Sequence, residues 1–368
     1  MQFIFDVAEL APDMGKSRGI YNYALNLFKE LVPLLPPDVR MLVTCNAGSA
    51  ADFVAPGVAQ VEQHVVLAGR TPGTMARQRW IRWGVQAFAR RHGVKVYFTP
   101  KGFLPGWWGR SAGLTTVAVL HDLIPLWYAD HHPDTFGRLE RWVVNGGLLR
   151  CARWADELVV ISQATAGDVH GRTGRPMADM HVIYNGIPLT KPGAAALMAE
   201  PYIFAVTSGL PHKNARGLLD AYARYRQQVS KPLPLVVCGL KDPLQDGVIA
   251  VSGLDDATLH AYYRDASLML FLSLIEGFGF PPLEAMAHGT PVLCADIPSL
   301  REVTGGAAAL VDPLDAAAVA DRMVALLADA VEVKALASKG PEVLSRYSWA
   351  MCAQQVWDVL RQASIRTR

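Results

Sequence analysis

Short apolar segments alternate with helical patterns along nearly the whole of this 368-residue chain. The apolar segment Phe3–Phe5 precedes a helical stretch at Tyr21–Leu31, and Met41–Thr44 follows that stretch. This alternation predicts parallel β-sheets with helices on both faces, because each helix returns the chain to start the next strand in the same direction. Further strands are expected at Lys95–Phe98, Thr116–Leu120, Leu158–Ile161, His181–Tyr184, Tyr202–Val206, Leu235–Cys238, Leu268–Leu272, Pro291–Cys294 and Ala309–Val311.

The alternation lapses between residues 188 and 201, where prolines, a glycine and an alanine-rich piece indicate a linker. A chain of this length is also expected to form two domains. We therefore predict a first α/β domain at residues 1–190 and a second at 191–348. A closing helix within 349–368, from about Trp349 to Ala363, could pack back on the first domain. Two such units suggest a ligand-binding cleft between them.

The charges nearly cancel, at a net +2, but they are unevenly spread. Residues 1–195 carry 20 Lys+Arg against 15 Asp+Glu, and the remainder carries 15 against 18. A mildly basic first half fits an anionic partner but falls far short of a nucleic-acid-binding signature. The five cysteines lie far apart, which suits a reducing cytoplasm and argues against a zinc site or disulfide framework. No signal peptide or membrane-spanning segment is recognisable, so any membrane contact is expected to be peripheral.

The segment Ser273–Pro291 has the most informative pattern, with a Glu-Gly-Phe-Gly turn, two prolines and a second glutamate. The glycines leave room for a ligand to approach the backbone. The prolines suit the first turn of a helix, whose free N–H groups would face an anion such as a pyrophosphate. Glu284 would lie about one turn inside that helix, where it could accept hydrogen bonds from sugar hydroxyls. The pattern suggests a nucleotide-sugar site; the alternative is an ordinary strand–turn–helix with solvated glutamates.

A second candidate is the strand-to-helix turn Val206–Asn214, which contains Gly209 and Lys213. Backbone amides and a lysine at such a turn can hold a phosphate. The alternative is a surface lysine at the start of a helix, which is common.

A third candidate is the pair His121-Asp122 at the end of the predicted strand Thr116–Leu120. Catalytic residues collect at the carboxyl ends of parallel strands. The alternative is a histidine satisfied by local backbone groups, with Asp122 capping a turn.

The loop Met14–Tyr21, which contains Gly15 and Gly19, matches neither G-x-G-x-x-G nor G-x-x-x-x-G-K-[ST]. This argues against a nicotinamide-dependent dehydrogenase and against a P-loop. The chain also has no D-x-D pair of the kind that holds a nucleotide diphosphate through a divalent metal. Lys213 and helix N-termini would then neutralise the phosphates, so neither a metal nor a cofactor is expected.

The segment Arg77–Arg91 is basic and aromatic, and with Trp107–Arg110 it could lie on an anionic membrane surface. An ordinary helix that buries residues 80, 81, 85 and 88 explains the same pattern. We favour the ordinary helix.

Taken together, these segments resemble the retaining glycosyltransferases of family 4, which have the GT-B fold. The family's E-x7-E signature matches Glu276 and Glu284, and its Gly-Ile-x-x-Tyr and His-Asp motifs match Gly19 and His121-Asp122. The resemblance covers nearly the whole chain and implies two Rossmann-like domains that face a central cleft. Weaker matches lie at Asp156–Ser162, Asn185-Gly186, Ala266–Ser273, Ser299–Val303 and Tyr347–Trp349.

The resemblance also implies roles for individual residues. Glu276, His121 and Lys213 are the expected catalytic residues. The expected donor-binding residues are Gly209, His212, Lys213, Ser273, Gly277, Phe278, Gly279 and Glu284, and the expected acceptor-side loop residues are Gly15, Gly19 and Asp122. One departure is His212, because the family often pairs its phosphate-binding lysine with an arginine; Arg216 is the alternative source of charge. The choice between a covalent intermediate and front-face substitution stays open.

The implied reaction is transfer of a hexose from a nucleotide sugar with retention of configuration. The His-Asp-Leu-Ile-Pro context resembles bacterial mannosyltransferases that build exopolysaccharide or O-antigen, which favours GDP-mannose over a UDP-hexose. The expected acceptor is a saccharide or a lipid-diphosphate-linked saccharide. The expected location is the cytoplasm, with peripheral contact to the inner membrane left open. A non-catalytic sugar-nucleotide-binding partner is the alternative, against which Glu276, Glu284, Lys213 and His121 all argue.

Overall fold

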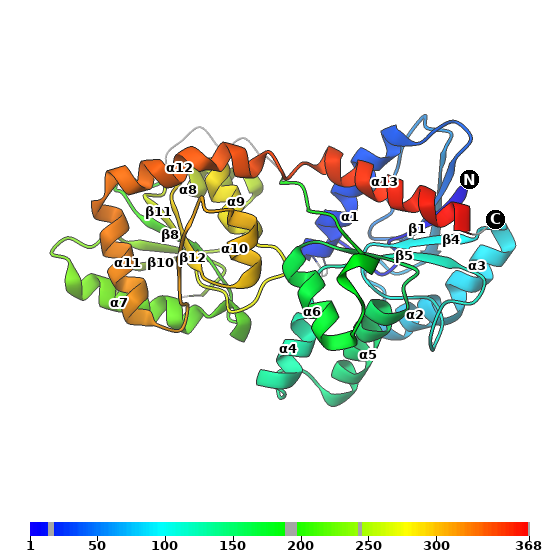
Figure 1. The fold of residues 1–368 in the computed structure, drawn as a ribbon, viewed down its shortest axis with the longest axis horizontal. Helices are drawn as coiled ribbons and strands as arrows, with labels where there is room; N and C mark the ends of the chain where they lie inside the picture. Colours follow the sequence, from blue (N-terminus) through cyan, green and yellow to red (C-terminus); the bar gives the residue numbers. More distant parts are fainter. Residues whose placement is uncertain (14–17, 188–196, 242–244, 367–368) are drawn as a thin grey trace. The chain divides into compact units, whose positions relative to one another are not determined.

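The computed structural model describes residues 1–13, 18–187, 197–241 and 245–366, and these form two α/β units (Figure 1). The first unit comprises Met1–Gly186 and Ser348–Arg368, and the second comprises Ile187–Tyr347. The predicted domain boundary at 190/191 and the predicted loop residue Gly15 lie outside the described residues.

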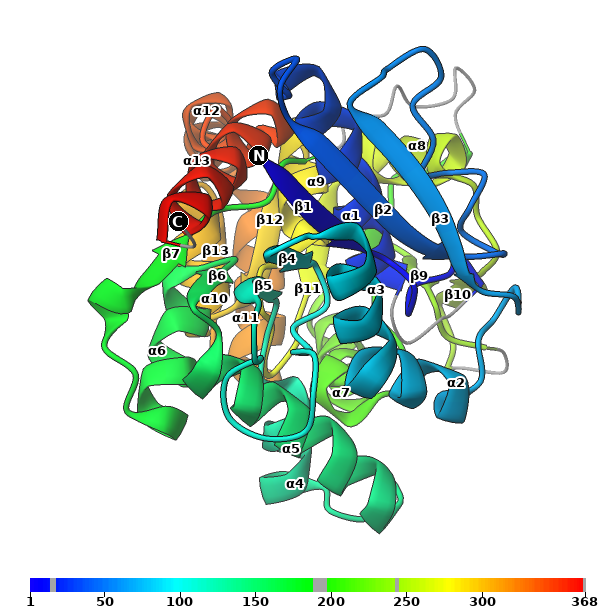
Figure 2. The ribbon, with the colours of Figure 1, turned by 90° about the vertical axis from the view of Figure 1, so that its right-hand side faces the viewer.

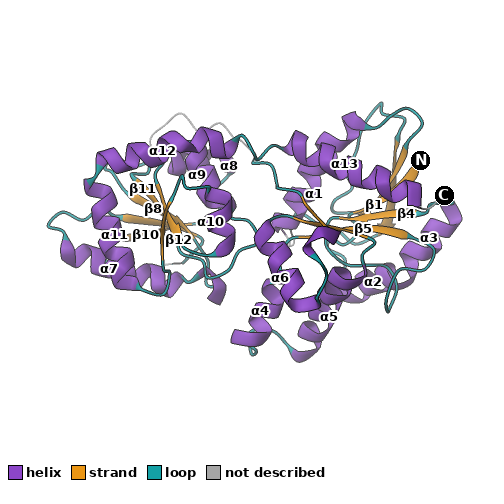
Figure 3. Ribbon diagram, in the orientation of Figure 1, coloured by secondary structure: helices purple, strands orange, loops and turns teal. Residues whose placement is uncertain are grey.

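The first unit is built on a seven-stranded parallel sheet in the order β3-β2-β1-β4-β5-β6-β7, with helices on its faces (Figure 3). Its strands are β1 (Gln2–Asp6), β2 (Arg40–Asn46), β3 (Val61–Leu67), β4 (Val96–Thr99), β5 (Thr115–Leu120), β6 (Glu157–Val160) and β7 (Met180–Val182). Its helical segments are α1 (Arg18–Leu31), η2 (Val32–Leu34), α2 (Thr74–Arg79), η3 (Trp80–Gly84), α3 (Val85–His92), α4 (Ile124–His131), α5 (Arg138–Trp154), α6 (Gln163–Thr173), η4 (Met177–Asp179) and α13 (Trp349–Arg366).

The second unit is built on a six-stranded parallel sheet in the order β10-β9-β8-β11-β12-β13. Its strands are β8 (Ile203–Val206), β9 (Leu235–Cys238), β10 (Val248–Val251), β11 (Leu268–Phe271), β12 (Val292–Ala295) and β13 (Ala309–Val311). Its helical segments are η5 (Pro211–Lys213), α7 (Ala215–Gln228), α8 (Asp256–Asp265), α9 (Phe280–Ala287), α10 (Pro298–Thr304), α11 (Ala316–Ala328) and α12 (Ala330–Leu344). Leucine, valine and isoleucine side chains from the central strands pack against α7 and α11 to form its core.

The predicted parallel α/β architecture is confirmed, and each predicted strand corresponds to an observed one. The prediction missed β3 and β10, which are edge strands of their sheets. An edge strand has only one neighbour and buries less surface, so its sequence need not be continuously apolar; this accounts for β3 but not for β10, whose four residues are all apolar. Strand β3 carries Glu62, Gln63 and His64 in its first half, which hides the strand pattern.

The last helix, α13, belongs to the first unit, although the whole second unit separates it in sequence from the rest of that unit. It packs along α1 and against β5 (Figure 2). Its buried face includes Val356, Trp357 and Leu360. The Trp357 ring lies 6.4 Å from that of Phe3 on β1.

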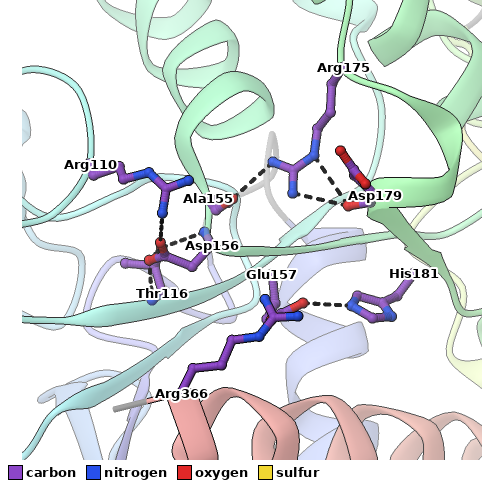
Figure 4. A network of polar contacts seen from close by, with 9 residues as sticks. All are labelled: Arg110, Thr116, Ala155, Asp156, Glu157, Arg175, Asp179, His181 and Arg366. Carbon is purple, nitrogen blue, oxygen red and sulfur yellow. Dashed lines mark hydrogen bonds and ion pairs between the residues drawn. The ribbon is translucent and has the colours of Figure 1, made fainter.

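A charged side chain also joins the end of α13 to the amino end of β6 (Figure 4). Arg366 forms an ion pair with the buried carboxylate of Glu157, which also lies 2.8 Å from Nε2 of His181. Beside them, Asp156 accepts hydrogen bonds from Arg110 and from the backbone of Thr116. This network lies at the opposite edge of the sheet from His121.

Candidate functional site

The second sheet has a topological switch point between its two central strands. Strand β8 starts the unit; the chain then adds β9 and β10 on one side and β11, β12 and β13 on the other. In open parallel sheets, ligands bind outside the carboxyl ends of the strands where the order reverses. The segment with Lys213 follows β8 and the segment with Glu276 follows β11, so the two strongest sequence candidates meet at this point.

Lys213 and Glu276 form an ion pair between their side chains. Both are mostly buried, with 25% of Lys213 and 11% of Glu276 exposed. The backbone joins the same two loops, because Leu274 N–H donates to the His212 carbonyl at 2.7 Å. Thr207 Oγ1 also donates to the Lys213 carbonyl at 3.0 Å, which ties the lysine to the end of β8. The ammonium and the carboxylate are therefore held in place by their backbones before any ligand binds.

The glycine turn between Glu276 and α9 has a conformation that requires glycine at Gly279. Its φ is 114°, and a Cβ there would lie 2.4 Å from Cδ2 of Leu300. By contrast, a Cβ at Gly209 would meet nothing within 4 Å, so no steric demand explains that glycine. Phe278 is buried against Phe280 and Tyr347, and Ser273 is buried at the end of β11. The expected prolines occupy the first turn of α9.

Glu284 lies one turn inside α9, as expected from the sequence. Burial raises the pKa of its carboxyl to about 7, while the nearby Tyr263 hydroxyl acts in the opposite direction. The charge of Asp256, at the start of α8, raises the pKa further. Glu284 is thus divided between its neutral and ionised forms near neutral pH, and a ligand that donates hydrogen bonds would favour the ionised form.

His212 does not supply the positive charge that the family's arginine would provide. Its side chain is buried, and burial together with the charge of Lys213 lowers the pKa of the imidazole to about 4. Arg216, the alternative source, is 95% exposed and lies 3.8 Å from Asp220, one turn along α7. Lys213 is therefore the cation that the loop after β8 directs to the switch point.

In the first unit, His121 directly follows β5 at the carboxyl edge of the sheet. Its Nε2 lies 2.7 Å from the Pro100 carbonyl, and its ring meets that of Tyr23 edge-on at 4.7 Å. Because a carbonyl oxygen can only accept, Nε2 carries the proton and Nδ1 keeps its lone pair. Burial lowers the pKa of His121 to about 4, so the imidazole is neutral at physiological pH.

The two other described residues of the predicted acceptor side have local roles. Asp122 Oδ1 accepts a hydrogen bond from the Ile124 N–H at 2.9 Å, which is the turn-capping alternative. Gly19 lies in the first turn of α1, where a Cβ would meet nothing within 4 Å.

A second ion pair, which sequence reasoning missed, lies at the switch point of the first sheet. Glu9 follows β1 and Lys101 follows β4, the two strands at which the strand order reverses. Lys101 Nζ lies 3.3 Å from Glu9 Oε2, and each side chain is 12% exposed. The buried Glu9 Oε1 has no hydrogen-bond partner within the described residues. The only sequence signal was a charged residue within three positions of the end of a strand, and its importance can be recognised only once the strand order is known.

None of the helices in the described parts of the chain combines the length and apolar character needed to cross a membrane.

Two protein-family models match consecutive parts of the chain. The model described as Glycosyltransferase Family 4 matches residues 17–191, and the model described as Glycosyl transferases group 1 matches residues 191–343. The O-antigen chain mannosyltransferase B of Escherichia coli is 33% identical over 169 residues, which is 42% of this chain and 44% of that protein. The O-antigen chain mannosyltransferase RfbU of Salmonella typhimurium is 26% identical over 318 residues, 82% of this chain and 85% of that protein.

Solved structures show the same fold at low sequence identity. WaaG, described as a glycosyltransferase involved in lipopolysaccharide biosynthesis, has a TM-score of 0.69 and 14% identity, and the match covers 97% of this chain and 99% of WaaG. Anabaena HepE, solved in complex with UDP and glucose, has a TM-score of 0.68 and 18% identity, and the match covers 98% of this chain and 100% of HepE. The predicted GT-B fold is thereby confirmed. The chain belongs to the glycosyltransferases, with a family 4 domain followed by a group 1 domain.

Proposed function

We propose that this protein transfers mannose from GDP-mannose, with retention of configuration, to a saccharide or lipid-linked acceptor in bacterial surface polysaccharide synthesis. The observation that carries the proposal is the Lys213–Glu276 pair at the switch point of the second sheet. The choice of sugar rests on the relatives, since both O-antigen relatives above are named mannosyltransferases. A UDP-hexose is the second candidate donor, because the similarly folded HepE was solved with UDP and glucose.

In this proposal Lys213 receives the diphosphate of the donor. Cleavage of the anomeric C–O bond builds negative charge on the leaving diphosphate, and a fixed ammonium in a mostly buried position stabilises that charge. Because Pro281 and Pro282 have no N–H, the backbone N–H groups of Gly279 and Phe280 at the start of α9 would add partial positive charge. We propose that Lys213 and these amides neutralise the diphosphate without a metal ion.

Glu276 would hold the hydroxyls of the transferred sugar. Binding of the diphosphate draws Lys213 away from Glu276, which frees a carboxylate that can accept hydrogen bonds from sugar hydroxyls. Glu284 would accept hydrogen bonds from the ribose. With these contacts, the outgoing phosphate oxygen can assist the acceptor hydroxyl on the same face of the sugar, which gives retention by front-face substitution.

His121 contributes as a neutral group. With its proton on Nε2 and its pKa near 4, it offers the Nδ1 lone pair as an acceptor. We assign to Nδ1 a hydrogen bond from a sugar hydroxyl, which leaves a partial negative charge facing the positive charge that develops on the sugar. On the acceptor side, Glu9 and Lys101 offer a carboxylate and an ammonium to a saccharide or its diphosphate.

Thermal shift measurements with GDP, UDP and ADP test the donor. GDP should raise the unfolding temperature more than UDP or ADP, whereas protection by UDP alone would contradict the assignment. A transfer assay with GDP-mannose and with UDP-hexoses then separates an enzyme from a non-catalytic partner. A partner would be stabilised by the nucleotide but would neither hydrolyse nor transfer the sugar.

A further inference from the structure

The first unit exposes tryptophan side chains to an unusual degree. It contains all nine tryptophans of the chain, and three exposed ones lie on η3 and on the loop after β4. These are Trp83, Trp107 and Trp108, with exposed fractions of 54%, 46% and 78%. Such a concentration of large exposed aromatic side chains marks an interaction surface rather than an ordinary exterior.

The helical segment at residues 80–85 contributes some side chains to the core and exposes others. Trp80, Ile81 and Val85 are buried, as the helical prediction for this segment required, but Trp83 is exposed. Residues 80–84 form a π turn between α2 and α3, and this turn changes the helical periodicity. The predicted buried face is therefore confirmed at Trp80, Ile81 and Val85, while Phe88 is half-buried and Trp83, which was not part of that face, is exposed.

The exposed rings are held in place. Trp83 and Trp107 meet edge-on with 5.2 Å between their ring centroids, and the Arg82 guanidinium lies 4.0 Å above the Trp107 ring. Gly106 N–H donates to the Ile81 carbonyl at 2.9 Å, which fixes the loop to η3. From α5, Arg150 donates to the carbonyls of Leu104, Pro105, Gly106 and Gly109. The loop thus presents Trp107 and Trp108 without needing to order itself on binding.

Positive charge accompanies these rings. Between residues 74 and 92 the chain has five arginines and neither aspartate nor glutamate. Arg79 is exposed, and Arg82 is half-buried against Trp107. Arginine side chains next to tryptophan rings suit a layer in which phosphate groups lie above hydrocarbon.

A largely apolar hollow opens beside Trp83. It has a volume of about 720 Å³ and is lined by Leu67, Ala76, Arg79, Trp80, Trp83, Gly84 and Ala87. Arg79 is the charged member of this lining. An apolar floor with one arginine fits a lipid molecule, with its phosphate near the guanidinium and its chain against the rings.

The amino-terminal end of α5 also exposes apolar and basic side chains. Leu139 and Trp142 are exposed there, and Arg138 precedes them. Helices α2 and α5 lie along the same edge of the first unit in both views (Figures 1 and 2). The exposed apolar and basic residues therefore extend over more than one element.

We propose that the surface formed by Arg79, Arg82, Trp83, Trp107 and Trp108, which we call the tryptophan–arginine surface, docks on an anionic phospholipid membrane. Indole rings favour the interfacial layer of a bilayer, and each arginine near an anionic surface adds to the attraction. A neutral saccharide would use the rings but would gain nothing from the arginines, which favours the membrane. The inference goes beyond the transfer reaction and does not depend on which sugar is transferred.

Vesicle sedimentation with the full chain tests the proposal. The vesicles contain phosphatidylcholine alone or with about 30 mol% phosphatidylglycerol. The wild type should bind the anionic vesicles at least about tenfold more tightly than the neutral ones, and less tightly as salt increases. The double variant Arg79→Glu/Arg82→Glu should lose at least about tenfold of this affinity. Arg224→Glu/Lys231→Glu, with two exposed residues of the second unit, changes the net charge equally and should stay within about twofold of the wild type.

A second variant tests the rings separately from the charges. Trp83→Ser/Trp108→Ser should weaken binding about tenfold even at high salt, where the arginines contribute less. The nucleotide-induced thermal shift of each variant reports whether the chain is folded and whether the second unit still binds its ligand. Loss of vesicle binding with that shift intact therefore concerns this surface and not the proposed reaction.

Three results would overturn the inference. Equal binding to neutral and anionic vesicles would remove the electrostatic basis. An equal loss in the Arg224→Glu/Lys231→Glu control would show that net charge alone matters. Displacement from vesicles by a soluble neutral mannan would assign the rings to saccharide stacking instead.

Discussion

The two sheets present the same pair of charges at the same topological position, but with the order reversed. In the first unit, the carboxylate of Glu9 follows the first strand, β1, and the ammonium of Lys101 follows β4. In the second unit, the ammonium of Lys213 follows the first strand, β8, and the carboxylate of Glu276 follows β11. The sheet topology therefore brings charged residues together at each switch point, and the surrounding loops decide which ligand they suit.

The surroundings differ in the way that a donor site and an acceptor site should differ. Beside Lys213 and Glu276 lie a glycine turn and the start of α9, which together suit a diphosphate. An aromatic ring lies near each lysine, Phe103 at 5.8 Å from Lys101 Nζ and Phe271 at 5.6 Å from Lys213 Nζ, but Glu9 keeps a buried oxygen without a described partner. An unsatisfied acceptor oxygen is costly in the free protein, so it would favour a ligand that donates a hydroxyl.

The largest effect should follow from breaking the pair in the second unit. Lys213→Ala and Glu276→Ala should each lower turnover by about a hundredfold, the usual cost of removing one group that stabilises developing charge. Steady-state kinetics with GDP-mannose measure this, and circular dichroism shows whether each variant stays folded. Arg224→Ala on α7 is the control and should keep wild-type turnover. A decrease of less than about tenfold in Lys213→Ala or Glu276→Ala would remove that residue from the scheme.

The matching substitutions in the first unit should affect the acceptor and not the donor. Glu9→Gln and Lys101→Met should each raise the acceptor KM by about tenfold, because each removes one charge-assisted contact. The nucleotide-induced thermal shift should stay the same. An unchanged acceptor KM together with weaker nucleotide binding would mean that the switch point of the first sheet binds the donor and not the acceptor.

A smaller effect is expected in the pH dependence of nucleotide affinity, which reports on Glu284 and not on the two ion pairs. The ribose hydroxyls should bind the ionised carboxylate, whose pKa burial raises to about 7 in the free protein. Nucleotide affinity should therefore increase by roughly tenfold between about pH 6 and pH 8. Isothermal titration calorimetry measures this increase.

Glu284→Gln is the control for that measurement, because it leaves only the titration of the nucleotide phosphate, near pH 6. An identical pH dependence in wild type and Glu284→Gln would exclude the carboxyl from the ribose site. The raised pKa also determines how Glu284 affects the free energy of unfolding. Because the folded state holds the proton more tightly than the unfolded state, Glu284 makes the free protein less stable as pH rises from about 4.5 to 7.

The smallest effect should come from a substitution at the amino edge of the first sheet, opposite the edge that carries His121. Arg366→Ala removes the ion pair with Glu157 but leaves His181, so we expect a loss of about 1 kcal/mol in the free energy of unfolding. Urea denaturation measures it, and turnover should not change. A loss of turnover without a loss of stability would show that this edge takes part in the reaction.

The sequence predicted the central strands and the second-unit site because both rest on local patterns. Continuous apolar runs mark buried parallel strands, and the Glu276-to-Glu284 segment carries its own turn and helix start. The Glu9–Lys101 pair could not be predicted in this way, since the partners are far apart in sequence and meet only through the strand order. The exposure of Trp83, by contrast, agrees with the helical pattern, whose predicted buried face at residues 80, 81, 85 and 88 leaves Trp83 out.

The most direct test of the central claim is a crystal structure of the protein with GDP. In that structure the diphosphate should lie within hydrogen-bonding distance of Lys213 Nζ and of the Gly279 and Phe280 amides at the start of α9, with the ribose at Glu284. A diphosphate bound at Lys101 in the first unit, with Lys213 still paired to Glu276, would contradict it.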